Sequence, residues 1–170
     1  MTPEHELDPK GLGDHIDRLY RAAWALCGSR EDAEDLVQDT FARVLARPRL
    51  VRRDEDLAYL LRVLRNTFIS GQRTLARRPR SAGTTPEELE LADPRLSTEP
   101  GAASEAREVY RAISELPADF RDALVAIDVA GLSYSEAARA LRVPEGTVTS
   151  RLYRARRQVV ERVDPRAADA

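Results

Sequence analysis

Residues 133–157 read SYSEAARALRVPEGTVTSRLYRARR, and this stretch decides the fold of the C-terminal part of the chain. Ser133 is a favourable N-cap for a short helix. A turn follows, and Pro144 is well placed to start a second helix that reaches about Val163. A short helix, a tight turn and a longer second helix are the layout of a helix-turn-helix. The stretch therefore predicts this motif.

The second helix of the motif has two different sides. Its apolar side should face the core and carries Val148, Leu152, Ala155 and Val159. The opposite side carries hydroxyl and guanidinium groups, namely Thr149, Ser150, Tyr153, Arg154 and Arg157. Groups of these types can bind base edges and phosphates in a major groove. The alternative is an amphipathic surface helix, but the turn, the small residues and the basic helix end together favour a DNA-reading helix.

The rest of the chain also has the periodicity of helices. Apolar residues at helical spacing predict one helix from about Asp14 to Gly28, a second from Ser29 to Pro48, and a third that begins with Leu57. Residues 79–104 lose the pattern and are rich in Pro, Gly, Ser and acidic residues, which is typical of a linker. We therefore predict an all-α fold of two small helical domains, residues 1–78 and 105–170, joined by a flexible linker.

The charge of the chain is sorted into blocks. The net charge is only -2, but residues 48–80 carry nine Arg against three acidic residues, and residues 142–162 carry six Arg against two. Residues 1–47 and 81–108 are acidic. A charge run is often only a solvated face. Two basic blocks at the ends of two helical domains nevertheless favour a nucleic-acid partner.

The third helix has a polar side that fits this interpretation. Opposite its leucines lie Tyr59, Arg62, Asn66, Ser70 and Arg73. An aromatic ring can stack on a base, an amide can pair with a base edge and arginines can hold phosphates, which together suit single-stranded nucleic acid. Taken alone, the same side could also be merely solvated.

The second helix is different because its exposed side is acidic. Glu31, Asp35, Gln38 and Asp39 lie there and would repel a phosphate backbone. This side predicts a protein partner. A domain with one acidic and one basic helix suits a protein that docks on a larger protein complex and also binds DNA.

Several classes of chemistry are not supported by the residues. Cys27 is the single cysteine, which excludes an intrachain disulfide, and two histidines cannot complete a cysteine/histidine zinc site with it. We expect Cys27 to be a small core residue without an activating cation. There is no glycine-rich phosphate loop, no clustered ligand spacing and no nucleophile–base pair. We predict no enzyme, no cofactor, no metal and no small-molecule substrate.

The N-terminus lacks the apolar run of a secretory signal, and no stretch approaches the ~18 apolar residues of a membrane span. We therefore expect a cytoplasmic protein without membrane insertion.

Two motifs resemble those of bacterial sigma factors. Residues 32–41, DAEDLVQDTF, are similar to the motif with which sigma factors bind core RNA polymerase. Residues 116–157, with YSEAA at 134–138 and PEGTVTSRL at 144–152, are similar to their C-terminal helix-turn-helix. The resemblance is to the extracytoplasmic-function (ECF) group, which keeps the second and fourth conserved regions of larger sigma factors and joins them by a short linker.

The resemblance implies a role for each part of the chain. Residues 1–78 would be region 2, residues 79–104 the linker and residues 105–170 region 4. The partners would be core RNA polymerase, promoter DNA and an anti-sigma factor. The chain would direct promoter-specific transcription initiation without a catalytic site of its own.

The resemblance also implies roles for the residues selected above. Core polymerase, through its clamp helices, would be contacted by Asp35, Gln38 and Asp39. The melted minus-10 element would be read by Tyr59, Arg62, Asn66, Ser70 and Arg73. The minus-35 element would be read by Thr149, Ser150, Tyr153, Arg154 and Arg157.

The main alternative is a helix-turn-helix repressor or response-regulator output protein, which would bind duplex DNA as a dimer without polymerase. Its N-terminal domain would need a coiled-coil seam or a ligand pocket, and the acidic second helix and basic third helix provide neither. For the free protein we expect compact arrangements of the two domains, because nothing in the sequence holds them apart.

Overall fold

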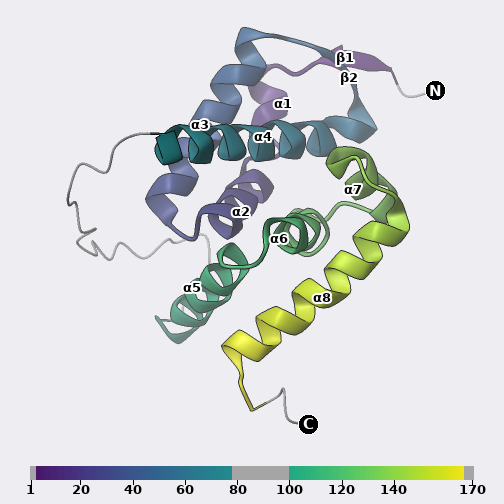
Figure 1. The fold of residues 1–170 in the computed structure, drawn as a ribbon. Helices are drawn as coiled ribbons and strands as arrows, with labels where there is room; N and C mark the ends of the chain where they lie inside the picture. Colours follow the sequence, from purple (N-terminus) through teal and green to yellow (C-terminus); the bar gives the residue numbers. More distant parts are fainter. Residues whose placement is uncertain (1–2, 78–99, 167–170) are drawn as a thin grey trace.

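The computed structural model describes residues 3–77 and 100–166 (Figure 1). Within these residues nearly all the regular structure is helical, as predicted. The N-terminal half contains β1 Glu4–Glu6, α1 Pro9–Gly13, α2 Ile16–Cys27, α3 Arg30–Ala46, β2 Leu50–Arg52, η1 Arg53–Glu55 and α4 Asp56–Arg77. The C-terminal half contains α5 Pro100–Ser114, α6 Ala118–Leu124, η2 Val125–Val129, α7 Tyr134–Leu141 and α8 Glu145–Val163. No helix in the described part of the chain is long and apolar enough to cross a membrane.

The helices of the N-terminal half begin and end where local signals place them. Gly28 ends α2 in the left-handed conformation, with a φ of 75° that glycine adopts without strain. Ser29 caps α3, where its side chain accepts a hydrogen bond from the backbone N–H of Asp32. Both helix ends follow the sequence prediction.

A short antiparallel ribbon, formed by β1 and β2, departs from the prediction. The apolar periodicity assigns no element to residues 4–6 or to the stretch between Pro48 and Leu57. In the structure Glu4 pairs with Arg52, His5 with Val51 and Glu6 with Leu50. Strands of three residues are too short for a visible alternation of apolar and polar residues, so a local pattern could not predict them.

The linker was predicted to span residues 79–104, and its residues 79–99 lie outside the described residues. Its last residues, 100–104, form the first turn of α5 instead. Proline fits the first position of a helix, and the alanines that follow Gly101 favour helix. The C-terminal helical segment therefore begins earlier than the apolar periodicity indicates.

The two halves pack against each other around α2. This helix contacts α3 and α4 on one side and α5 and η2 on the other (Figure 1). The rings of Trp24 in α2 and Tyr110 in α5 stack with centroids 4.7 Å apart. A Cβ atom at Gly28 would lie 2.5 Å from the hydroxyl oxygen of Ser114, so the ends of α2 and α5 meet too closely for a side chain. The compact arrangement expected for the free protein is the one observed.

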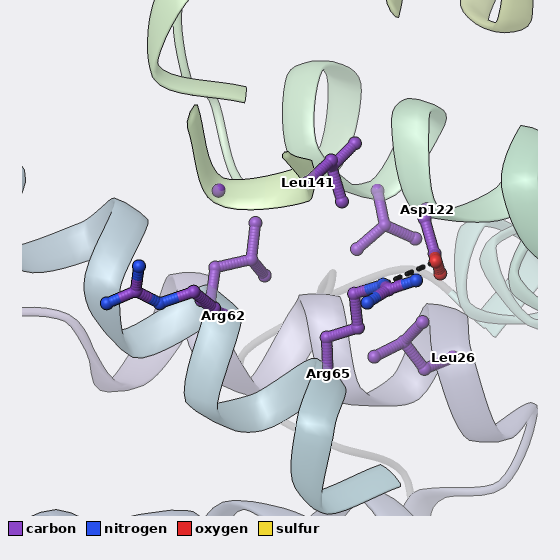
Figure 2. Close-up of a pocket in the computed structure, with 8 residues that line it drawn as sticks. Leu26, Arg62, Arg65, Asp122 and Leu141 are labelled. Atoms are coloured by element: carbon purple, nitrogen blue, oxygen red, sulfur yellow. Dashed lines mark hydrogen bonds and ion pairs between the residues drawn. The ribbon is translucent and has the colours of Figure 1, made fainter. Parts of the chain in front are cut away.

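An ion pair fastens α4 to α6 across this interface. Figure 2 shows Arg65 of α4 reaching Asp122 of α6, and the exposed fraction of the Asp122 side chain is only 6%. The cavity beside the pair, between Leu26 and Leu141, has a volume of about 10 Å³. Such a space holds about one water molecule at most. The interface is therefore closely packed around the buried pair.

Candidate nucleic-acid interface

The helix-turn-helix forms as predicted. Ser133 and Glu136 make a reciprocal capping box at the start of α7: the Ser133 hydroxyl accepts from the Glu136 backbone N–H, and the Glu136 carboxylate accepts from the Ser133 backbone N–H. The Ser133 hydroxyl also donates to the Glu136 carboxylate at 2.6 Å, and this hydrogen bond, followed by the one from the Ser133 backbone N–H, lowers the pKa of Glu136. The turn after α7 places Arg142 in the left-handed region, with a φ of 58°.

The α8 helix has the two sides that the sequence indicates. Val148, Leu152 and Ala155 are buried, whereas Val159 is only partly buried. The side predicted to read DNA is exposed along its whole length, at Thr149, Ser150, Tyr153, Arg154 and Arg157. The exposed fraction of Tyr153 is 69%, an unusual exposure for a large aromatic residue. The structure thus presents all five predicted residues to solvent.

The hydroxyl groups of Thr149 and Ser150 are bonded to their own helix. Thr149 Oγ1 donates to the carbonyl of Glu145 over 3.0 Å, and Ser150 Oγ donates to that of Thr147 over 3.1 Å. Each hydroxyl oxygen keeps lone pairs that can accept another hydrogen bond. In this state the two side chains suit donors on the DNA, such as the amino groups of adenine and cytosine.

The arginines of α8 fall into two groups. Most are held by partners within the protein. Arg151 pairs with Asp119 at 2.8 Å, Arg156 with Asp128 at 2.7 Å and Arg157 with Glu161 at 2.9 Å, and Arg162 donates to the carbonyl of Ala112.

Arg154, by contrast, has no ion pair or side-chain hydrogen bond among the described residues. Arg151 ties α8 to α6, and Arg156 ties it to η2. The pair of Arg157 is an exposed i,i+4 pair, worth only about 0.3–0.5 kcal/mol, so this residue remains easy to redirect. Sequence reasoning could not separate Arg154 from Arg151 and Arg156, because the partners of those two residues come from distant elements.

The predicted polar side of α4 is also present. Tyr59, Arg62, Asn66, Ser70 and Arg73 follow one another at helical spacing, and the last three are exposed. The guanidinium of Arg62 lies over the Tyr59 ring, 5.6 Å from its centroid. Arg65 does not belong to this side because it turns toward Asp122 in the interface between the two halves.

The start of α4 borders a groove that the sequence analysis did not identify. The groove has a volume of about 330 Å³ and lies between the β1–β2 ribbon, α4 and α7. Four arginines line it, namely Arg49, Arg52, Arg62 and Arg139, together with Tyr59 and Glu4. Arg139 of α7 pairs with Glu55 at 3.0 Å. The basic block of residues 48–80 was the available signal, but it could not show that Arg139 joins the same surface.

The acidic side of α3 is exposed as predicted. Asp35, Gln38 and Asp39 face solvent, whereas Leu36, Val37 and Thr40 are buried beneath them. Asp35 and Asp39 stand four residues apart on one face, where like charges repel each other. A basic partner surface would relieve this repulsion.

Comparison with known proteins places both halves in one family. Residues 12–78 match the family model described as Sigma-70 region 2, and residues 106–159 match Sigma-70, region 4. The chain is 34% identical over 165 residues to the ECF RNA polymerase sigma factor SigC of Mycobacterium tuberculosis, covering 92% of this chain and 87% of SigC.

It is also 34% identical over 146 residues to SigE of Mycolicibacterium smegmatis, covering 85% of this chain but 57% of SigE. Among solved structures, the sigma factor RpoE from Bartonella quintana, in complex with the anti-sigma factor NepR, matches with a TM-score of 0.62 and 27% identity. That match covers 89% of this chain and 93% of RpoE. With both conserved regions matched and relatives covered over most of their length, the chain belongs to the ECF group of RNA polymerase sigma factors.

Proposed function

We propose that this chain binds core RNA polymerase through α3 and directs transcription initiation by reading the minus-35 element with α8 and the minus-10 element with α4. The observation that carries the proposal is the exposed side of α8. It combines the free guanidinium of Arg154 with the exposed ring of Tyr153, on the second helix of a helix-turn-helix. In such motifs the second helix lies in the major groove and its first turns contact base edges.

For the minus-35 element, the proposed contacts come from the five exposed residues of α8. Thr149 and Ser150 stand in the first turns, where side chains reach bases. Tyr153 and Arg154 follow one turn later and Arg157 two turns later, where the groove wall brings phosphates within reach of long side chains. The ion pairs of Arg151 and Arg156 hold the helix in the orientation that this docking requires.

For the minus-10 element, the proposed contacts come from the polar side of α4. Asn66 can pair with a base edge, Ser70 and Arg73 can hold the backbone, and Tyr59 with Arg62 offers a stacking surface. The supporting observation is that Asn66, Ser70 and Arg73 are exposed side by side on one helix face.

For core polymerase, the proposed contacts are Asp35, Gln38 and Asp39 on the acidic side of α3. The domains follow the same division: residues 1–78 would bind polymerase and the minus-10 element, residues 79–104 would connect, and residues 105–170 would bind the minus-35 element. The protein would act in the cytoplasm, beside polymerase and DNA, and would perform no catalytic step itself. An anti-sigma protein would control it, as the complex of the similar RpoE with NepR suggests.

Run-off transcription with core polymerase on a genomic promoter library tests this function. The wild-type chain should select promoters with two elements. The double variant Asp35→Arg, Gln38→Ala should abolish both core binding and transcription, because it places a cation where a basic surface must dock. Circular dichroism would check that the helices remain.

Arg111→Ala is the matched control, because Arg111 is an exposed arginine of α5 outside the three proposed surfaces. Normal core binding by the double variant would remove α3 from the interface. A wild-type chain that binds core but selects no promoter would defeat the proposal as a whole.

A further inference from the structure

The N-terminal strand β1 lies before the part of the chain that matches the region 2 family model. The region 2 match begins at residue 12, whereas β1 spans Glu4–Glu6. Its partner β2 leads through η1 directly into α4, the helix proposed to read the minus-10 element. A segment outside the residues that this model matches therefore pairs with the strand that leads into the proposed reading helix.

The strand is anchored at two points, one after its C-terminal end and one at its middle residue. A two-stranded ribbon is only marginally stable in water, so it needs further contacts. Leu7 and Leu12, which follow β1, are buried in the core, and the Asp8 carboxylate caps α1 by accepting from the Gly11 backbone N–H at 2.7 Å. These contacts fix the strand from its C-terminal side.

The second anchor is a contact between His5 and Asp56. His5 Nε2 lies 3.2 Å from Asp56 Oδ2, and the exposed fraction of Asp56 is 7%. Asp56 is the first residue of α4, and its other carboxylate oxygen has no hydrogen-bond partner in the structure. The imidazole of His5 is thus the described hydrogen-bond partner of a buried carboxylate at the start of the reading helix.

The strand also reaches the groove at the start of α4. Glu4 lines this groove together with Tyr59 and Arg62, one turn after Asp56. A shift of the strand would therefore move both the groove wall and the helix end from which these two side chains project. The contact is well placed to determine how Tyr59 and Arg62 meet a base.

We propose that the N-terminal strand β1 supports the minus-10 surface by fixing the start of α4. In this role His5 is a positioning residue that holds Asp56. The inference rests on the proposed function of α4. His5 itself touches no DNA. Without it, the buried carboxylate of Asp56 has no hydrogen-bond partner among the described residues, and the first turn of α4 moves toward water to solvate that group.

The test compares His5→Ala and His5→Gln in the full chain assembled with core polymerase. The probe is a fork-junction DNA whose single-stranded part carries the minus-10 sequence selected in the run-off experiment. The Gln amide can donate to Asp56 as the imidazole does, whereas alanine cannot. Glu6→Gln is the matched control, because Glu6 lies on the same strand and faces solvent.

His5→Ala should weaken fork binding about five-fold, the effect of one lost hydrogen bond. It should also reduce discrimination between the selected minus-10 sequence and single-base variants of it. Affinity for core polymerase, measured in the same preparations, should stay within about two-fold, and His5→Gln should restore fork binding. Asp56→Asn should resemble the wild type, because its amide oxygen still accepts from His5, and Asp56→Ala should resemble His5→Ala.

Three results would overturn the inference: unchanged fork binding by His5→Ala, an equal loss of core and fork binding, or no rescue by His5→Gln. The variant Asn66→Ala distinguishes a failure of the proposed role of His5 from a failure of the proposed role of α4. If Asn66→Ala leaves fork binding unchanged, α4 does not read the element and both proposals fall. If Asn66→Ala weakens fork binding and His5→Ala does not, only the positioning role is wrong.

Discussion

Arg154 differs from its neighbours on α8 because it has no partner within the described part of the chain. If it contacts a phosphate, Arg154→Ala should weaken binding of every duplex sequence and lower the slope of log affinity against log salt by about one unit. Arg156→Ala offers a contrast, because Arg156 is held by Asp128 and its loss should act through stability. A salt titration of duplex binding distinguishes the two, and an unchanged slope in Arg154→Ala would place that residue outside the interface.

Cys27 was predicted to be a core residue without an activating cation, and the structure modifies this. The residue is partly buried, and Arg121 lies near it from the other half of the chain. Burial nevertheless dominates and, with a smaller contribution from Asp32, raises the pKa of the thiol to about 12, although Arg121 opposes the rise. Thiolate is therefore scarce at neutral pH.

Labelling of the native protein by a thiol reagent at pH 8 should consequently be at least about a hundredfold slower than labelling of the denatured chain. Equal rates in the two states would show that Cys27 is exposed and reactive.

At the scale of single elements, the capping box of α7 gives a pH-dependent contribution to stability. The folded state lowers the pKa of Glu136 below its ordinary value of 4.5, so the charged carboxylate stabilises the fold above that pH. The contribution is lost as the pH falls through the lowered pKa.

Glu136→Gln should therefore lower the free energy of unfolding at pH 7, and the difference from the wild type should shrink below about pH 4. Ser133→Ala should cost about 1 kcal/mol at pH 7 because it removes the cap itself. Urea denaturation at several pH values measures both. A difference between Glu136→Gln and wild type that is the same at every pH would contradict the capping role of the charge.

Elements that depend on local signals could be predicted from the sequence, and elements that depend on distant partners could not. Gly28, Ser29, Pro117 and Ser133 mark helix ends through their own backbone preferences, and the structure has helix ends at each. The β1–β2 ribbon joins residues 4–6 to residues 50–52, and Arg65 meets a carboxylate 57 residues away. The spacing of apolar residues shows that the helices of each half must bury an apolar face. It does not show that the apolar faces of the two halves form one common core.

For the whole molecule, the Arg65–Asp122 pair should contribute to the contact between the two halves. Removing one partner leaves a charge in a closely packed interface, so Arg65→Ala and Asp122→Ala should each lower the free energy of unfolding by roughly 2 kcal/mol, less than for a fully buried pair because Arg65 is partly exposed. The double variant should lose less than the sum of the two. Urea denaturation measures the cycle.

The exposed pair of Arg111 and Glu115 is the control, with an expected coupling of about 0.3–0.5 kcal/mol. Small-angle scattering should show a larger radius of gyration for Asp122→Arg, which places two cations together at the interface. An unchanged radius and additive losses would show that the ion pair does not hold the halves together.

The Arg65–Asp122 pair should also lower the non-specific affinity of the free protein for DNA. While Arg65 is bound to Asp122, its charge is neutralised and turned away from the basic side of α4. At physiological salt, the release of counterions supplies most of the free energy of non-specific binding to DNA. Each guanidinium that is withdrawn from the phosphates reduces the number of released counterions by about one. A sigma factor with its two halves packed together would therefore bind random chromosomal sequence more weakly. More of the free protein would then bind polymerase before it binds DNA.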